Sequence, residues 1–79
     1  MPTKDEVAGA RAKILRHCGE WGSRGPRSVF PMTDAFVAAG RQLGDEGLVD
    51  YTTGEVRGGL QLGLRLTDAG VEHLKQGGR

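Results

Sequence analysis

Residues 60–70 read LQLGLRLTDAG, and this stretch decides the fold. A leucine stands at every second position from Leu60 to Leu66, and alternate side chains of a β-strand share one face. Thr67 follows at once and is a typical helix N-cap, because its hydroxyl can accept a hydrogen bond from a backbone N–H of the first turn. Asp68 would lie in that turn, where the helix dipole favours a negative charge. The stretch therefore predicts a strand that passes directly into a helix.

The chain on either side of this stretch predicts the rest of a β-hairpin and a last helix. Residues 48–53, LVDYTT, are typical of a strand that would pair antiparallel with residues 60–66. The connection, GEVRGG at 54–59, is predicted to be a flexible loop that carries Arg57. The last helix is expected from Asp68 to about Gln76, and the glycine-rich end at 77–79 is expected to fray.

The first half of the chain predicts two amphipathic helices joined by a glycine-rich segment. The first helix is expected from Lys4 to Cys18, since apolar residues recur along it at helical spacing. Trp21 continues this apolar stripe and is expected to fold back into the core. Residues 19–32 are predicted to form a glycine-rich loop that ends in a short extended segment. The second helix should begin at the N-cap Thr33 and reach about Glu46. Its inward stripe comprises Phe36, Ala39, Gly40 and Leu43.

Size and composition limit the fold and its setting. The 79 residues suffice for one small domain of the α+β class, with the elements in the order α-(short β)-α-β-β-α. Hydrophobic residues make up 37% of the chain and charged residues 27%, which is typical of a folded domain rather than a disordered segment. No apolar run approaches the ~20 residues of a membrane span, and the polar N-terminus lacks the apolar centre of a signal peptide. We therefore expect a cytoplasmic location and no membrane partner.

The reactive residue types show no pattern typical of a metal site or an active site. Cys18 is the only cysteine, so neither an intrachain disulfide nor a cysteine-ligated zinc site is expected, and a core thiol is the favoured interpretation. His17 is adjacent to it, and neighbours on a helix point about 100° apart, which suits a nucleophile–base pair poorly. The glycines match no phosphate-binding or dinucleotide-binding fingerprint. We expect a protein without enzymatic activity, metal or cofactor.

Four pieces of the C-terminal half occur together in the order seen in a known family. They are Leu43, the step DEGLV at 45–49, the glycine- and arginine-containing loop at 54–59, and LTDAG at 66–70. In this order they resemble the end of a winged helix-turn-helix domain of the MarR or PadR type. The resemblance extends over residues 33–75 and implies a small winged-helix-like domain with a recognition helix followed by a wing at 54–59. Such domains carry two helices between the first helix and the wing, whereas this chain has room for one.

The resemblance also implies a transcriptional regulator that binds duplex DNA, with homodimer formation left open. Arg41 and Gln42 face outward on the predicted recognition helix, where they would pair with guanine and adenine. Thr33 lies at the N-terminal end of that helix, which would enter the groove. The arginines expected at phosphates are those of the glycine-rich loop and the wing, Arg24, Arg27 and Arg57.

The charge of the second helix favours an alternative, a non-enzymatic protein–protein interaction module on the same scaffold. Its three acidic residues against Arg41 alone give the helix a net charge of −2, whereas DNA binding relies on positive charge. Because one fold hosts many functions, such a module could act as a small phage or mobile-element inhibitor of host machinery. Its interaction face would comprise Asp34, Val37, Ala38, Asp45 and Glu46. Both interpretations stay open on the sequence.

Overall fold

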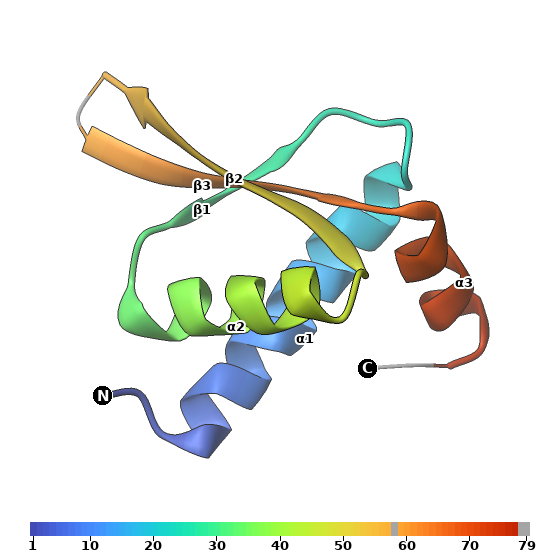
Figure 1. Ribbon diagram of the computed structural model, residues 1–79, viewed down its shortest axis with the longest axis horizontal. Helices are drawn as coiled ribbons and strands as arrows, with labels where there is room; N and C mark the ends of the chain where they lie inside the picture. The colour runs from blue at the N-terminus through green and yellow to red at the C-terminus, as the bar shows by residue number, and fades with distance from the viewer. Residues whose placement is uncertain (58, 78–79) are drawn as a thin grey trace.

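The computed structural model describes residues 1–57 and 59–77, which form three helices and a three-stranded antiparallel sheet (Figure 1). Along the chain, the elements are α1 (Lys4–Trp21), β1 (Ser28–Pro31), α2 (Asp34–Asp45), β2 (Val49–Val56), β3 (Gly59–Leu66) and α3 (Asp68–Lys75). The predicted α+β class and the order α-(short β)-α-β-β-α are thereby confirmed. Within the described residues, no helix has both the length and the apolar character to cross a membrane.

The central strand of the sheet is β3, with β1 on one side and β2 on the other. The predicted alternation of its leucines holds for most of its length. Leu62, Leu64 and Leu66 are each 2% exposed or less, on the face that the helices cover. Leu60 departs from the pattern and is 54% exposed. The reason is visible in Figure 1, where the β2–β3 hairpin extends past the helices that bury the rest of the strand.

The helices α1 and α2 pack against the inner face of the sheet and against each other (Figure 1). Both begin at a threonine cap: Thr3 accepts a hydrogen bond from the N–H of Glu6, and Thr33, as predicted, accepts one from the N–H of Phe36. The predicted inward stripe of α2 is confirmed, with Ala39, Gly40 and Leu43 buried and Phe36 partly buried against the core. Cys18 of α1 is also buried, as a core thiol would be.

The first helix is longer than predicted, because it continues through Trp21 and ends where Gly22 takes a positive φ of 67°. The expectation that Trp21 enters the core is wrong, since its side chain is 55% exposed. Phe30 of β1, by contrast, belongs to the core and is 6% exposed. Its ring stacks on Phe36 at a centroid distance of 5.5 Å and meets His17 edge-on at 5.9 Å. The predicted loop at 19–32 is therefore shortened by the last turn of α1 and by β1.

The predicted wing loop at 54–59 is mostly strand. The ladder between β2 and β3 continues through the pairs Gly54–Gln61 and Val56–Gly59. Gly59 has a φ of 132°, a backbone conformation that favours glycine, so the sequence can turn within very few residues. Gly58 of this loop, and residues 78–79 of the predicted frayed tail, lie outside the described residues. The hairpin is a long two-stranded ribbon rather than two short strands joined by a flexible loop.

The junction between β3 and α3 is tied to the connection between α2 and β2 through Thr67. Its hydroxyl caps α3 by accepting from the Gly70 N–H at 3.0 Å, and it donates to the carbonyl oxygen of Gly47 at 2.6 Å. The backbone N–H of Thr67 donates to the Leu48 carbonyl at 3.0 Å. Gly70 lies so close to Leu48 that an added Cβ would overlap the same carbonyl oxygen. The segments DEGL at 45–48 and LTDAG at 66–70 are therefore in contact in the fold. The same contact leaves room only for glycine at position 70.

We expect Gly70→Ala to destabilise the protein by about 1–3 kcal/mol or more, the cost of forcing extra atoms into a packed site. The methyl group would displace the Leu48 carbonyl and weaken its hydrogen bond from Thr67. Gly9→Ala is the matched control, because Gly9 is also helical but its Cβ would meet no atom within 4 Å. Chemical denaturation measures both. Equal stability of the two variants would contradict the close approach at Gly70.

Leu43→Ala should lower the free energy of unfolding by about 2–5 kcal/mol, the range for truncating a buried leucine. Leu43 is 0% exposed and belongs to the core. Leu60→Ala is the same substitution at a 54% exposed position, and it should change the stability by less than about 0.5 kcal/mol. A thermal midpoint for Leu43→Ala no lower than that for Leu60→Ala would show that α2 packs differently.

Candidate nucleic-acid interface

The hairpin tip and the start of α2 lie toward the same side of the molecule (Figure 1). β1 runs antiparallel to β3 with Pro31 opposite Gln61, so the chain leaves β1 on the side of the hairpin tip. The N-cap Thr33 follows, and α2 begins there (Figure 1). We call residues 52–61 of the hairpin the arm; every arm residue whose burial is described is exposed. The arm and the first turns of α2 together form the arm end of the molecule.

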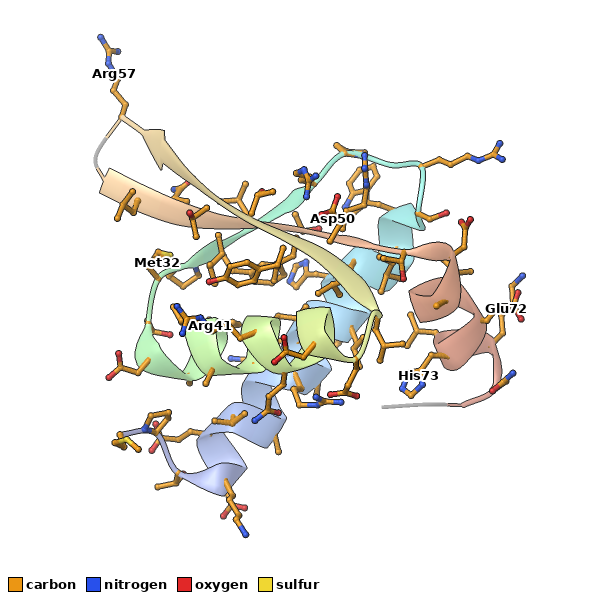
Figure 2. All side chains as sticks on the ribbon, in the orientation of Figure 1. Met32, Arg41, Asp50, Arg57, Glu72 and His73 are labelled. Atoms are coloured by element: carbon orange, nitrogen blue, oxygen red, sulfur yellow. The ribbon has the colours of Figure 1, made fainter. Side chains whose placement is uncertain are left out.

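Three of the predicted DNA-binding residues lie at the arm end. Arg57 stands at the tip of the arm and points away from the molecule (Figure 2). Arg41 is exposed on α2 and borders a hollow between α2 and β2 that Tyr51 also lines. Thr33 is exposed, and its hydroxyl is engaged in capping α2. The structure thus brings one arginine of the helix and one of the hairpin to the same end.

Arg27 occupies a different position, on the outer face of the sheet. Its guanidinium donates twice to Asp50, to the backbone carbonyl at 3.1 Å and to the carboxylate at 2.7 Å. To reach β2 it crosses the central strand at Gly63, where an added Cβ would lie 3.4 Å from the Arg27 Cδ. Arg65 lies 3.7 Å from the same carboxylate. The positive charge of Arg27 is therefore paired within the sheet, away from the place expected of a phosphate contact beside α2.

Arg24 lies at the opposite end of the sheet from the arm. The connection that carries it enters β1 at Ser28, which pairs with Leu64 near the base of the hairpin. Figure 1 shows this connection and the hairpin tip at opposite ends of the sheet. The structure does not bring Arg24 together with Arg41 and Arg57, although all three are exposed.

Gln42 and Glu46 lie on the side of α2 that faces α1. Arg11 of α1 donates to the Gln42 side-chain oxygen at 3.3 Å and to both carboxylate oxygens of Glu46, one of them at 3.0 Å. The hydrogen bond from Arg11 holds the pKa of the Glu46 carboxyl below its usual range. The Gln42 side chain would have to break its hydrogen bond with Arg11 before it could form hydrogen bonds with an adenine. The remaining residues of the predicted protein-interaction face point outward from α2 or are partly buried beside it: Asp34, Val37, Ala38 and Asp45.

The formal charges at the arm end cancel. By sequence, the arm and residues 33–41 carry two positive residues, Arg41 and Arg57, and two negative ones, Asp34 and Glu55. Affinity for DNA of any sequence comes mostly from neutralising phosphates, so this surface would hold random DNA weakly. Specific contacts and shape would have to supply more of the affinity than in a strongly basic protein.

Sequence patterns missed three residues that shape this region. Arg11 joins α1 to α2 through partners 31 and 35 positions away, and a separation of that length leaves no local signal. Leu60 and Met32 are exposed apolar side chains at the arm end, 54% and 37% exposed. The alternation of leucines predicts which face of the strand Leu60 lies on. It does not predict where along the strand the covering helices end, so the exposure of Leu60 could not be predicted from it.

A scan against protein-family models found no match to this chain, and neither did searches of curated proteins and of solved structures. Among residues 1–57 and 59–77, no three His, Cys, Asp or Glu side chains lie in a group that could hold a metal ion. The arrangement of the arm end is therefore the observation on which a functional proposal must rest.

The Arg11–Glu46 pair should stabilise the protein at neutral pH and lose its effect in acid. The pKa of Glu46 is lowered from its ordinary 4.5 in the folded protein, so the contribution is complete above that value and is lost as the pH falls through the folded-state pKa. Since the Glu46 side chain is 45% exposed, Glu46→Gln should cost at most about 1 kcal/mol at pH 7.

This prediction is checked by denaturation of wild type and Glu46→Gln at pH 7 and at pH 3. The difference in stability should shrink toward zero at the lower pH. Glu72→Gln is the control, because its partner Lys75 lies 3.6 Å away in a more exposed pair within one helix. A difference for Glu46→Gln that is the same at both pH values would contradict the ion-pair account.

Proposed function

We propose that this protein is a small winged-helix DNA-binding protein that acts as a transcriptional regulator. One observation carries the proposal: α2 and the exposed arm lie at the same end of the molecule, and α2 leads directly into the hairpin. The sheet order β1-β3-β2 supports it, because a winged-helix domain that lacks one helix of its helix-turn-helix pair would have this topology. The resemblance of residues 33–75 to such domains points the same way.

In the proposed complex, the first turns of α2 enter the major groove, which at about 12 Å is wide enough for a helix. Arg41 reaches a base edge, where its planar guanidinium can contact a guanine through two hydrogen bonds. The arm follows the neighbouring backbone, and Arg57 binds a phosphate there. Thr33 lies at the leading end of the helix. Gln42 remains bound to Arg11 and serves to hold α2 on α1.

The neutral charge of the arm end sets a quantitative expectation. With Arg57 at a phosphate and Arg41 in the groove as its two positive charges, the logarithm of the binding constant should fall with the logarithm of the salt concentration with a slope no steeper than about −2. A protein of this kind would find its site through base contacts and shape. It would bind random duplexes poorly at physiological salt.

The test compares three arginine variants on two kinds of DNA. One is a duplex selected from a random pool for tight binding to the wild type, called the selected duplex, and the other is a set of random duplexes. Arg57→Ala should weaken binding on every sequence and flatten the salt slope by about one unit, as the loss of one phosphate contact does. Arg41→Ala should cost about 1–3 kcal/mol on the selected site and little on random DNA, because it removes a base contact. Arg24→Ala is the matched control, an exposed arginine at the far end of the sheet, and it should leave binding unchanged.

The outcomes separate the parts of the proposal. If Arg41→Ala lowers the affinity equally for all DNA sequences, Arg41 contacts a phosphate rather than a base. A loss for Arg24→Ala as large as that for Arg57→Ala would place the interface elsewhere. Absence of binding by the wild type to any duplex at low salt would refute the proposed function.

A protein partner is the second candidate, and the exposed apolar side chains at the arm end favour it. Leu60 and Met32 lie there beside a surface of mixed charge, a composition more typical of protein interfaces than of DNA-binding surfaces. The interaction face predicted on α2 would retain Asp34, Val37, Ala38 and Asp45, while Glu46 is tied to Arg11. This candidate takes precedence if the wild type does not bind duplex DNA.

A further inference from the structure

The side chain of Tyr51 lies between α2 and the hairpin, at the point where the arm begins. Tyr51 is on β2, opposite Leu64, with its side chain on the inner face of the sheet. The next residue, Thr52, is the first of the arm. The ring therefore lies between α2 and the residue of β2 from which the arm extends, so the spacing between α2 and β2 at Tyr51 affects the position of the arm.

Two glycines of α2 make room for this ring. A Cβ added to Gly40 would lie 3.0 Å from Cε2 and 3.1 Å from Cδ2 of Tyr51, tighter than ordinary van der Waals contact. A Cβ added to Gly44, one turn later, would lie 3.6 Å from the Tyr51 Cβ. The backbone of α2 at Gly40 thus lies against the Cδ2–Cε2 edge of the ring, and the ring stands between α2 and β2.

The contact differs from the other aromatic contact of α2. Phe36 stacks on Phe30 of β1, a strand that reaches only the first residue pair of the arm, where Pro31 lies opposite Gln61. Phe36 therefore fixes the start of α2 on the sheet. Tyr51 fixes α2 relative to the hairpin itself. Tyr51 is partly buried and also packs against the edge of the core.

We propose that Tyr51 is a positioning residue that sets the separation between α2 and the arm, so that both engage one partner duplex at the same time. The inference rests on the proposed function, since it gives Tyr51 a role in the simultaneous contact of Arg41 and Arg57 with DNA. A rigid spacing lowers the cost of making the second contact once the first is formed. Without the ring, the arm and the helix would bind as loosely connected parts.

The first experiment measures the spacing without DNA. Spin labels on Asp34→Cys and Arg57→Cys, in a Cys18→Ala background, report the distance between the start of α2 and the arm tip. We expect one narrow distance distribution in the parent and in Tyr51→Phe, which keeps the ring. Tyr51→Ala should broaden it, and Gly40→Ala should shift it, because the added methyl group presses on the ring.

Leu74→Ala is the matched control for a loss of stability, because Leu74 packs against Gly19, on α1, away from the arm. It should leave the distribution unchanged. If Tyr51→Ala and Gly40→Ala both leave the distribution of the folded protein unchanged as well, the ring does not set the spacing and the inference is overturned.

The second experiment measures coupling to the DNA contact. In the wild type, Arg57→Ala should weaken binding to the selected duplex about tenfold, whereas in a Tyr51→Ala background it should weaken binding less than about twofold further. Tyr51→Phe should restore the full effect. An equal loss in both backgrounds would overturn the positioning role and leave the proposed function standing. Absence of duplex binding by the wild type would refute the proposed function and, with it, the role of Tyr51.

Discussion

The carbonyl group of Leu48 is the point on which the rest of the structure depends. Its oxygen accepts a hydrogen bond from the backbone N–H of Thr67, and Gly70 packs so closely beside it that there is no room for a Cβ. Together with the hydrogen bond from the Thr67 hydroxyl to Gly47, this contact joins the end of α2 to the start of α3. It also fixes the register of β3 on β2, since Leu66 must lie opposite Val49 for the two connections to meet. A slip of one residue would turn every leucine of β3 away from the core.

The register fixed at this junction determines which part of the hairpin is left uncovered. Leu62, Leu64 and Leu66 lie under the helices, and the strand continues past them into the arm. Ion pairs stabilise the covered part. Arg11 holds α2 on α1 through Glu46, and Arg27 crosses β3 to reach Asp50. Both arginines are thereby committed to the fold, while Arg41 and Arg57 remain exposed at the arm end for the proposed contact with DNA.

Local chemistry explains which features could be predicted from the sequence. Threonine caps at the starts of the helices, the period-two leucines and the apolar stripe of α2 are short-range signals, and each is found in the structure. Trp21 continues the helical spacing of the apolar stripe but is exposed, because spacing alone cannot show whether another element covers the last turn of α1. Arg24, Arg27 and Gln42 were grouped with Arg41 and Arg57 by residue type. Their actual partners and places depend on pairings between distant elements, for which one sequence carries no local signal.

The most direct test of the proposed interface is to map the amide resonances of the ¹⁵N-labelled protein while a selected duplex is added. The account predicts shifts at the start of α2, from Thr33 through Arg41, and in the arm, at residues 52–57 and 59–61. The connection at 22–27 should remain unchanged, because it lies at the other end of the sheet. Shifts centred on that connection or on α1, or no shifts at low salt, would contradict the account.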